Sequence, residues 1–306
     1  MRKRYFTRAG VVALVAVLAT GPWSPPAQAD DPLFVSWSGL LPPIAWQYDP
    51  SSSDDCVAGR DSCVKRTINQ MEKRLEPLAA SCDHAAVFGL AYLRTTETYL
   101  DTAQTPGFYA DPNFVNHEDI TFAAAYYSAY DNWVAGRVDR VPPAWRIAFD
   151  AGRSRSVSGS GNLLLGINAH VNRDLPFVLA AIGLTAPDGT SRKPDHDKID
   201  VMLNRVYPPL LEEEAARFDP AMASIQTPYG VGYTGLMQML VAWREAAWRH
   251  AELLVAAPDD ATRALVVKDI ETSAATAARS IVASSQYLPP LSTTTTRDAY
   301  CAMQNG

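Results

Sequence analysis

The chain has 306 residues, with 33 Asp and Glu against 27 Lys and Arg, which gives a formal net charge of −6 at pH 7. This acidic balance argues against nucleic acid or anionic lipid as a partner held by bulk charge, because such binding depends on Lys and Arg neutralising phosphate. The length is compatible with one large domain or with two.

Residues 1–29 have the pattern of a secretory signal peptide. Basic residues precede an apolar core at 11–18 that is too short to span a bilayer, and residues 27–29 (Ala-Gln-Ala) match the small-x-small cleavage pattern. We expect cleavage before Asp30 and an exported protein, by either the Sec or the twin-arginine route. Cleavage would leave 33 acidic against 23 basic residues, a formal charge of −10. No later apolar run approaches the roughly 20 residues of a spanning helix, so no transmembrane segment is expected in the mature chain.

All four cysteines lie beyond the predicted cleavage point. An even number in an exported chain predicts two disulfides, for which three pairings exist. We favour Cys56–Cys63 closing a local loop and Cys82–Cys301 tying the C-terminal tail to an early helix. The spacings do not resemble the paired C-x2-C of zinc sites.

The N-terminal third of the mature chain predicts an irregular arm followed by two helices. Residues 30–60 are rich in Pro, Ser and Asp and contain no helical periodicity. Apolar residues at three- and four-residue steps then predict helices over residues 62–80 and 84–103, with Ser62 and Asp83 as their N-caps.

The next predicted helix, residues 120–130, follows a loop at 106–113. His117 and Asp119 fall at or just before its first turns, where they could supply metal ligands. Acidic residues also favour a helix start because of the helix dipole, so this concentration has a purely structural explanation as well. Tyr126, on the apolar face of the helix, is a candidate binding residue.

The most apolar segment of the mature chain predicts a helix over residues 162–184 that also carries polar side chains. His170 and Asp174 are four residues apart, which places them on one helix face. Asn172 between them is a candidate binding residue. Pro176 removes a backbone hydrogen bond, so a kink is expected next to this turn.

Three further helices are predicted in the C-terminal half, over residues 196–218, 233–256 and 259–285. His196 and Asp200 repeat the four-residue spacing at the start of the first of them. They are weaker candidate ligands, because a charged helix start is usually solvated.

These elements predict an all-α fold. We expect a single compact bundle of about seven helices over residues 61–306, after the signal peptide at 1–29 and the irregular arm at 30–60. Strand-like alternation and internal repeats are lacking, as are the G-x-S-x-G and H-E-x-x-H motifs.

The candidate functional residues that remain are a set of histidine–carboxylate pairs. Zinc binds imidazole and carboxylate in about fourfold coordination, and helical bundles build such sites from pairs on facing helices. The candidate metal ligands are His170, Asp174, His117 and Asp119, with His196 and Asp200 as weaker ones.

Residues 165–174 (Leu-Gly-Ile-Asn-Ala-His-Val-Asn-Arg-Asp) resemble the L-G-x-x-x-H-x-x-x-D helix of zinc-dependent phospholipases C and single-strand-specific nucleases. The resemblance implies an exported all-α hydrolase of lipid or phosphoester substrates, with zinc on His170 and Asp174. The mature chain departs from that family by starting at Asp30 instead of a zinc-binding Trp, and it has no H-x-x-x-E helix. The segment from Gly166 to Pro176 is also similar to a family of actinobacterial secreted helical proteins of unknown function, which implies no activity.

Three functional hypotheses follow. The first is a secreted metal-dependent hydrolase, with zinc as its cofactor and a small molecule or lipid as its ligand. The second is a non-catalytic, envelope-associated binding or structural protein in which His170 and Asp174 form a buried polar network. The third is a metal-free acid–base enzyme that uses the same two residues as a dyad.

Overall fold

The computed structural model describes residues 48–226, 231–289 and 296–305, and this part of the chain is almost wholly helical. Its only extended pairings are two isolated bridges, Val157 with Gln286 and Thr185 with Ser191. The all-α prediction is therefore confirmed. The predicted signal peptide and most of the predicted arm lie outside the described residues, while residues 48–60 form turns and bends.

The described residues contain ten α-helices, more than the seven expected, because the central helix is interrupted and the tail adds a helix of its own. In chain order they are α1 (Asp61–Ala80), α2 (Ala85–Ala103), α3 (Pro112–Val134), α4 (Pro143–Arg153), α5 (Gly159–Ile167), α6 (Leu175–Ile182), α7 (Lys193–Arg217), α8 (Val231–Ala256), α9 (Asp260–Ser284) and α10 (Arg297–Asn305).

Helix α3 begins eight residues earlier than the sequence analysis expected, at Pro112 and not at Ile120. Asp111 is its N-cap and accepts a hydrogen bond from the Phe114 amide at 3.1 Å. An Asp cap followed by Pro at the first helical position is a favourable helix start, because Pro has no amide hydrogen to leave unpaired. As a result His117 lies inside the helix and not at its start, and it is buried.

The predicted central helix is continuous but changes its winding. Between α5 and α6, residues Asn168–Asp174 form a π-helix. The expected kink at Pro176 thus takes the form of a π turn just before the proline, which is a known way for a helix to absorb a missing backbone hydrogen bond. The π turn contains His170, Asn172 and Asp174.

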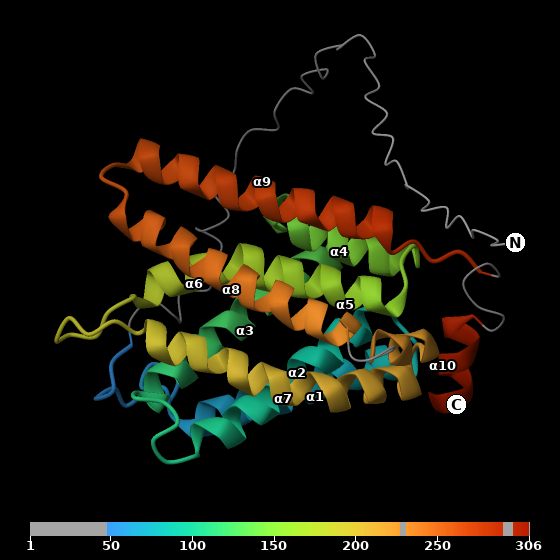
Figure 1. The fold of residues 1–306 in the computed structure, drawn as a ribbon, viewed down its shortest axis with the longest axis horizontal. Coiled ribbons are helices and arrows are strands. Elements are labelled where there is room, and N and C mark those ends of the chain that lie inside the picture. Colours follow the sequence, from blue (N-terminus) through green and yellow to red (C-terminus); the bar gives the residue numbers. More distant parts are fainter. Residues whose placement is uncertain (1–47, 227–230, 290–295, 306) are drawn as a thin grey trace, which may run out of the picture. The chain divides into compact units, whose positions relative to one another are not determined.

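The π turn lies at the centre of the helical body, where it contacts α3, α4, α8 and α9. Figure 1 shows α8 and α9 as an antiparallel pair, in which α8 passes across α6 and α9 lies along α4. On the other side, α2 packs on α1 and α7. The largest fully buried side chains include Trp145, Leu163 and Leu175, so the polar residues of the π turn are surrounded by the main apolar core.

The two favoured disulfides, Cys56–Cys63 and Cys82–Cys301, are both present. The second one attaches α10 to the segment between α1 and α2. Arg297 at the start of α10 also donates a hydrogen bond to Asn162 Oδ1 at 2.7 Å.

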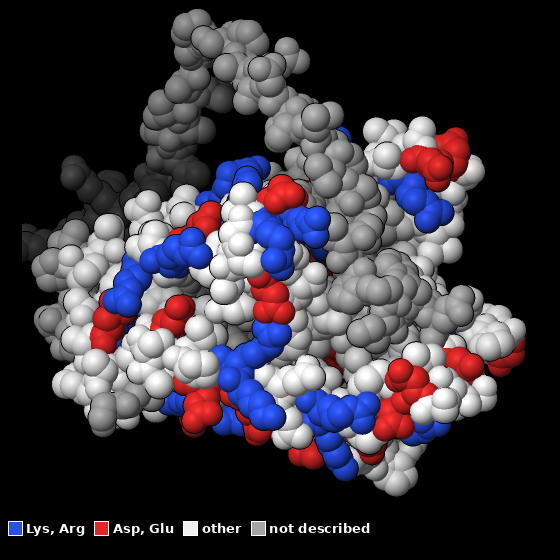
Figure 2. All heavy atoms as spheres, turned by 180° about the vertical axis from the view of Figure 1, so that it is seen from behind, with Lys and Arg blue, Asp and Glu red and all other residues white. Residues whose placement is uncertain are grey.

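Charged side chains of both signs are interspersed on the face opposite to that of Figure 1 (Figure 2). Ion pairs between helices also occur: Arg74 lies 2.6 Å from Asp131 and Arg94 lies 2.7 Å from Glu213. Within the described ranges, no helix has both the length and the apolar character required to cross a bilayer.

Candidate functional site

The sequence-predicted pair, His170 and Asp174, is in direct contact inside the π turn. His170 Nδ1 lies 3.2 Å from Asp174 Oδ2, which also accepts a hydrogen bond from Trp145 Nε1 at 2.8 Å. Asp174 Oδ1 accepts from Arg173 Nη1 at 2.9 Å, and Arg173 Nε donates to Glu271 Oε1 on α9 at 3.0 Å. We call these five residues the core polar network. Each of them is at most 5 % exposed, so both oxygens of Asp174 have protein donors in a water-excluded setting.

His170 is enclosed by aromatic rings. The Phe122 ring stacks on the imidazole with 3.3 Å between centroids, and the Tyr92 ring meets it edge-on at 4.5 Å. Burial lowers the pKa of His170, and the nearby Asp174 only partly opposes this shift. A neutral imidazole beside a carboxylate places its proton on Nδ1, which then donates to Asp174. Nε2 has no hydrogen-bond partner among the described residues.

Two further candidates, His117 and Asn172, have hydrogen-bond partners other than His170 and Asp174. His117 Nδ1 is 2.8 Å from the carbonyl oxygen of Cys56. Asn172 Nδ2 donates to Asn168 Oδ1 at 2.9 Å, and Asn168 in turn donates to the Ala274 carbonyl on α9. Asn172 is therefore part of a helix-to-helix contact.

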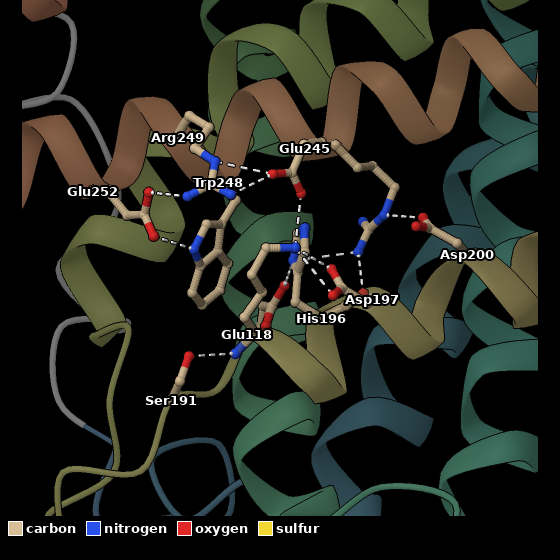
Figure 3. A network of polar contacts seen from close by, with 11 residues as sticks. Glu118, Ser191, His196, Asp197, Asp200, Glu245, Trp248, Arg249 and Glu252 are labelled. Atoms are coloured by element: carbon tan, nitrogen blue, oxygen red, sulfur yellow. Dashed lines mark hydrogen bonds and ion pairs between the residues drawn. The ribbon is translucent and has the colours of Figure 1, made fainter.

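His196 belongs to a separate polar cluster between α7 and α8 (Figure 3). Arg244 from α8 donates to the His196 carbonyl at 2.7 Å and to Asp200 Oδ1 at 2.7 Å. Glu118 from α3 approaches the His196 ring at 3.8 Å. The start of α7, which was expected to be solvated, is thus partly buried, since His196 is only 2 % exposed. This burial lowers the pKa of the His196 imidazole.

The donor geometry of the described residues bears on the predicted zinc site. All five histidines of the sequence lie in the described ranges. Within these ranges, no three side chains of His, Cys, Asp or Glu come together in a way that could hold a metal ion. Asp174, the ligand implied by the resemblance, directs both oxygens to protein donors. The described residues thus offer no preformed three-ligand zinc centre, and we derive no step through zinc.

A pocket lies between α2, α3, α6, α7 and α8, and we call it the α3–α7 pocket. It encloses about 540 Å³ of space, including its open mouth, against about 410 and 330 Å³ for two pockets on either side of Tyr126. Its walls are mainly apolar and comprise Val115, Phe122, Leu175, Ile199, Met202 and Leu203. Phe122 is the ring that covers His170, and Leu175 follows the π turn directly, so the pocket adjoins the core polar network.

The polar groups of the α3–α7 pocket come from three helices. Consecutive acids, Glu118 and Asp119, line it from α3, Arg244 from α8, and Tyr92 from α2. Asp119 Oδ2 and the Tyr92 hydroxyl are both enclosed and have no hydrogen-bond partner among the described residues. Unpaired buried polar atoms are uncommon, because each one costs free energy unless something binds it.

Within this pocket, the carboxyl of Asp119 has a raised pKa. Burial raises the pKa of its carboxyl from 3.8 to about 8, and the neighbouring Glu118 carboxylate contributes further. The side chain is nonetheless partly accessible, since it lines the pocket. A strongly shifted carboxyl in a concave, mostly apolar site is a typical feature of a functional site.

Asp119 was named from the sequence as a candidate metal ligand, and the structure places it in the wall of this pocket. Arg244 and Tyr92 were not singled out from the sequence, because a buried Arg within an apolar helix and a Tyr on a helix face carry no distinctive pattern. Tyr126, a predicted binding residue, is 5 % exposed and lines the two smaller pockets.

These features define an all-helical, disulfide-bonded protein with a buried polar network next to a mostly apolar pocket. The chain belongs to a family of unknown function, DUF5995, whose model matches residues 64–284. This range includes every residue of the core polar network and of the α3–α7 pocket. Comparisons with curated proteins and with solved structures each found no match.

Proposed function

We propose that this chain is an exported binding protein whose α3–α7 pocket takes a small, mostly apolar ligand. The pocket itself is the observation that carries the proposal: it has mainly apolar walls from α3, α6 and α7, on which a few polar groups from α2, α3 and α8 converge. Small-molecule sites are typically concave and mostly apolar, with a few precisely placed polar groups that orient the ligand. Export is supported by the two disulfides, which form and persist in oxidising compartments.

In this proposal the core polar network has a structural role. Asp174 joins Trp145 of α4 to the π turn, and Arg173 joins the turn to Glu271 of α9. The network fixes the position of His170, on which Phe122 stacks, and Phe122 forms a wall of the pocket. It thereby keeps the pocket preformed, which reduces the ordering cost of binding.

The test is ligand binding observed by ¹⁹F NMR with 4-fluorotoluene, a small neutral apolar probe. We expect its resonance to broaden with the wild-type protein and to stay sharp with Ile199→Trp, because the larger ring fills the pocket from α7. Val201→Trp is the matched control: Val201 is on the same helix, is 50 % exposed and does not line the pocket. This control should bind the probe as the wild type does.

Two results would overturn the proposal: no broadening with the wild type, or equal broadening with the wild type and Ile199→Trp in a folded sample. The metal-dependent hydrolase is distinguished by elemental analysis. Stoichiometric zinc in the purified protein, lost in His170→Ala, would favour the hydrolase over a binding protein.

A further inference from the structure

The charged groups of the α3–α7 pocket leave it with a surplus of negative potential. The guanidinium of Arg244 is already paired with Asp200 at 2.7 Å, so its charge is largely neutralised by its own partner. Among the described residues, Glu118 and Asp119 have no comparable cation: Glu118 approaches the His196 ring at 3.8 Å, and burial keeps that imidazole in its neutral form. A ligand with a negative charge would meet the Glu118 carboxylate without a free counter-charge.

The pocket also contains a buried hydroxyl group, that of Tyr92, without a hydrogen-bond partner among the described residues. Tyr92 is only 6 % exposed and lines the pocket, and its hydroxyl has no partner among the described residues. Its oxygen and Asp119 Oδ2 are two enclosed acceptors in one pocket. The Tyr92 and Phe122 rings add aromatic surface, which attracts cations. Acceptors and aromatic rings together are suited to a group that brings several N–H donors and a positive charge.

We propose that the ligand of the α3–α7 pocket is a primary amine on a short apolar body, with its ammonium group bound by Asp119 and the Tyr92 hydroxyl. This inference rests on the pocket being the binding site, as proposed above. The ammonium group has three N–H donors, which can bond to both unpartnered oxygens, Asp119 Oδ2 and the Tyr92 hydroxyl. Its positive charge also offsets the acidic side chains on α3. The apolar body replaces water against Ile199, Met202 and Leu203.

Amine binding is then linked to release of a proton. In the free protein the raised pKa of Asp119 keeps its carboxyl protonated at neutral pH, whereas the ammonium requires the carboxylate. The other titratable groups facing Asp119 are Glu118, Tyr92, Tyr99, Tyr109, Tyr127 and Arg244. Burial raises the pKa of all four tyrosines, so they stay neutral, and the α6 and α7 walls carry no ionisable group. Between pH 6 and pH 8 the affinity for an amine should therefore rise with pH.

The experiment compares 4-fluorobenzylamine with 4-fluorobenzyl alcohol, its neutral counterpart of similar shape, by ¹⁹F NMR titration of the full chain at pH 6, 7 and 8. The amine stays protonated over this range, so a change in affinity with pH comes from the protein and not from the probe. We expect the amine to gain about tenfold or more in affinity from pH 6 to pH 8, because each pH unit below a group's pKa changes its ionised fraction about tenfold. The alcohol should gain nothing, and at pH 8 the amine should bind more tightly.

Asp119→Asn should abolish both the preference for the amine and its pH dependence. Asp197→Asn removes one acidic charge from the exposed surface of α7 and should change neither, which controls for general electrostatic attraction. Equal, pH-independent binding of both compounds would overturn the amine proposal and leave the pocket intact as a binding site. Failure of both compounds and of 4-fluorotoluene would overturn the pocket itself.

Discussion

Asp119 is the residue at which the proposed ligand binding conflicts most clearly with stability. Its pKa is about 8 in the folded protein and 3.8 in its ordinary state, so the folded protein holds a proton that the unfolded chain has lost at intermediate pH. Stability decreases with pH wherever the native state binds more protons. This group therefore lowers the free energy of unfolding progressively as pH rises from about 4 to about 8.

We predict that Asp119→Asn stabilises the protein, increasingly so at higher pH. The difference in unfolding free energy from the wild type should grow by up to about 1.4 kcal/mol per pH unit between pH 5 and pH 7 and level off above about pH 8. Urea unfolding at each pH measures it. Asp101→Asn, at an exposed site on α2, should leave the curve unchanged. A constant difference across this range would show that the Asp119 carboxyl is ionised normally in the folded state.

Asp174 is the opposite case, a carboxylate on which the core depends. Asp174→Ala would leave the buried donors of Trp145, His170 and Arg173 without their common acceptor. Removing one partner of a buried, paired charge typically costs about 3–5 kcal/mol. We expect a loss of that order in urea unfolding and a smaller one for Asp174→Asn, which retains one acceptor oxygen. An unchanged midpoint in Asp174→Ala would contradict a structural role for the network.

At the scale of helices, the close approach of α5 to α2 depends on Gly166. A Cβ at this position would overlap Cβ, Cγ and Cδ2 of Phe88, whose ring also contacts His170. Because these atoms are near the Phe88 backbone, they cannot move aside easily. The lack of a side chain therefore sets the spacing that brings the aromatic residues of α2 against the π turn.

Gly166→Ala should accordingly destabilise the protein by about 1–3 kcal/mol, the usual cost of overpacking, despite the better helix propensity of Ala. Gly235→Ala makes the same change in α8, where nothing lies within 4 Å of the new Cβ, and should be neutral or stabilising. Thermal melts of the two variants provide the comparison. Equal melting temperatures for the two variants would mean that α5 can move away from Phe88 at no cost.

The helices were predicted well where the hydrophobic periodicity was strong. They were predicted poorly where a short motif is compatible with both a loop and a helix start. Asp111-Pro112 was interpreted as part of a loop, although Asp111 is the N-cap of α3. Asp119 was therefore predicted to lie at a helix start, whereas it lies inside α3 in the wall of the pocket. The π turn could not be derived, because Pro176 predicts a distortion but not the kind. The pairing of His170 with Asp174 follows from helix geometry, whereas the contacts of Asp119, Tyr92 and Arg244 depend on the packing of three helices.

At the scale of the whole molecule, the two disulfides differ in how much of the chain they constrain. Cys82–Cys301 closes a loop with a sequence separation of 219 and Cys56–Cys63 one with a separation of 7. A cross-link removes more entropy from the unfolded chain when the loop is longer, giving about 5 kcal/mol for the long loop and about 2 kcal/mol for the short one as upper values. Cys82→Ser/Cys301→Ser should thus lower the unfolding free energy more than Cys56→Ser/Cys63→Ser does.

Urea unfolding of the two double variants, each against the oxidised wild type, measures this order. The long disulfide also holds α10 in place, but the hydrogen bond from Arg297 to Asn162 and the 2.8 Å contact of Asp298 with His84 remain when it is removed. The native fold around the pocket should therefore survive, and 4-fluorotoluene should still bind to the folded variant. A smaller loss from the long disulfide than from the short one would mean that the unfolded chain already keeps its two ends close together.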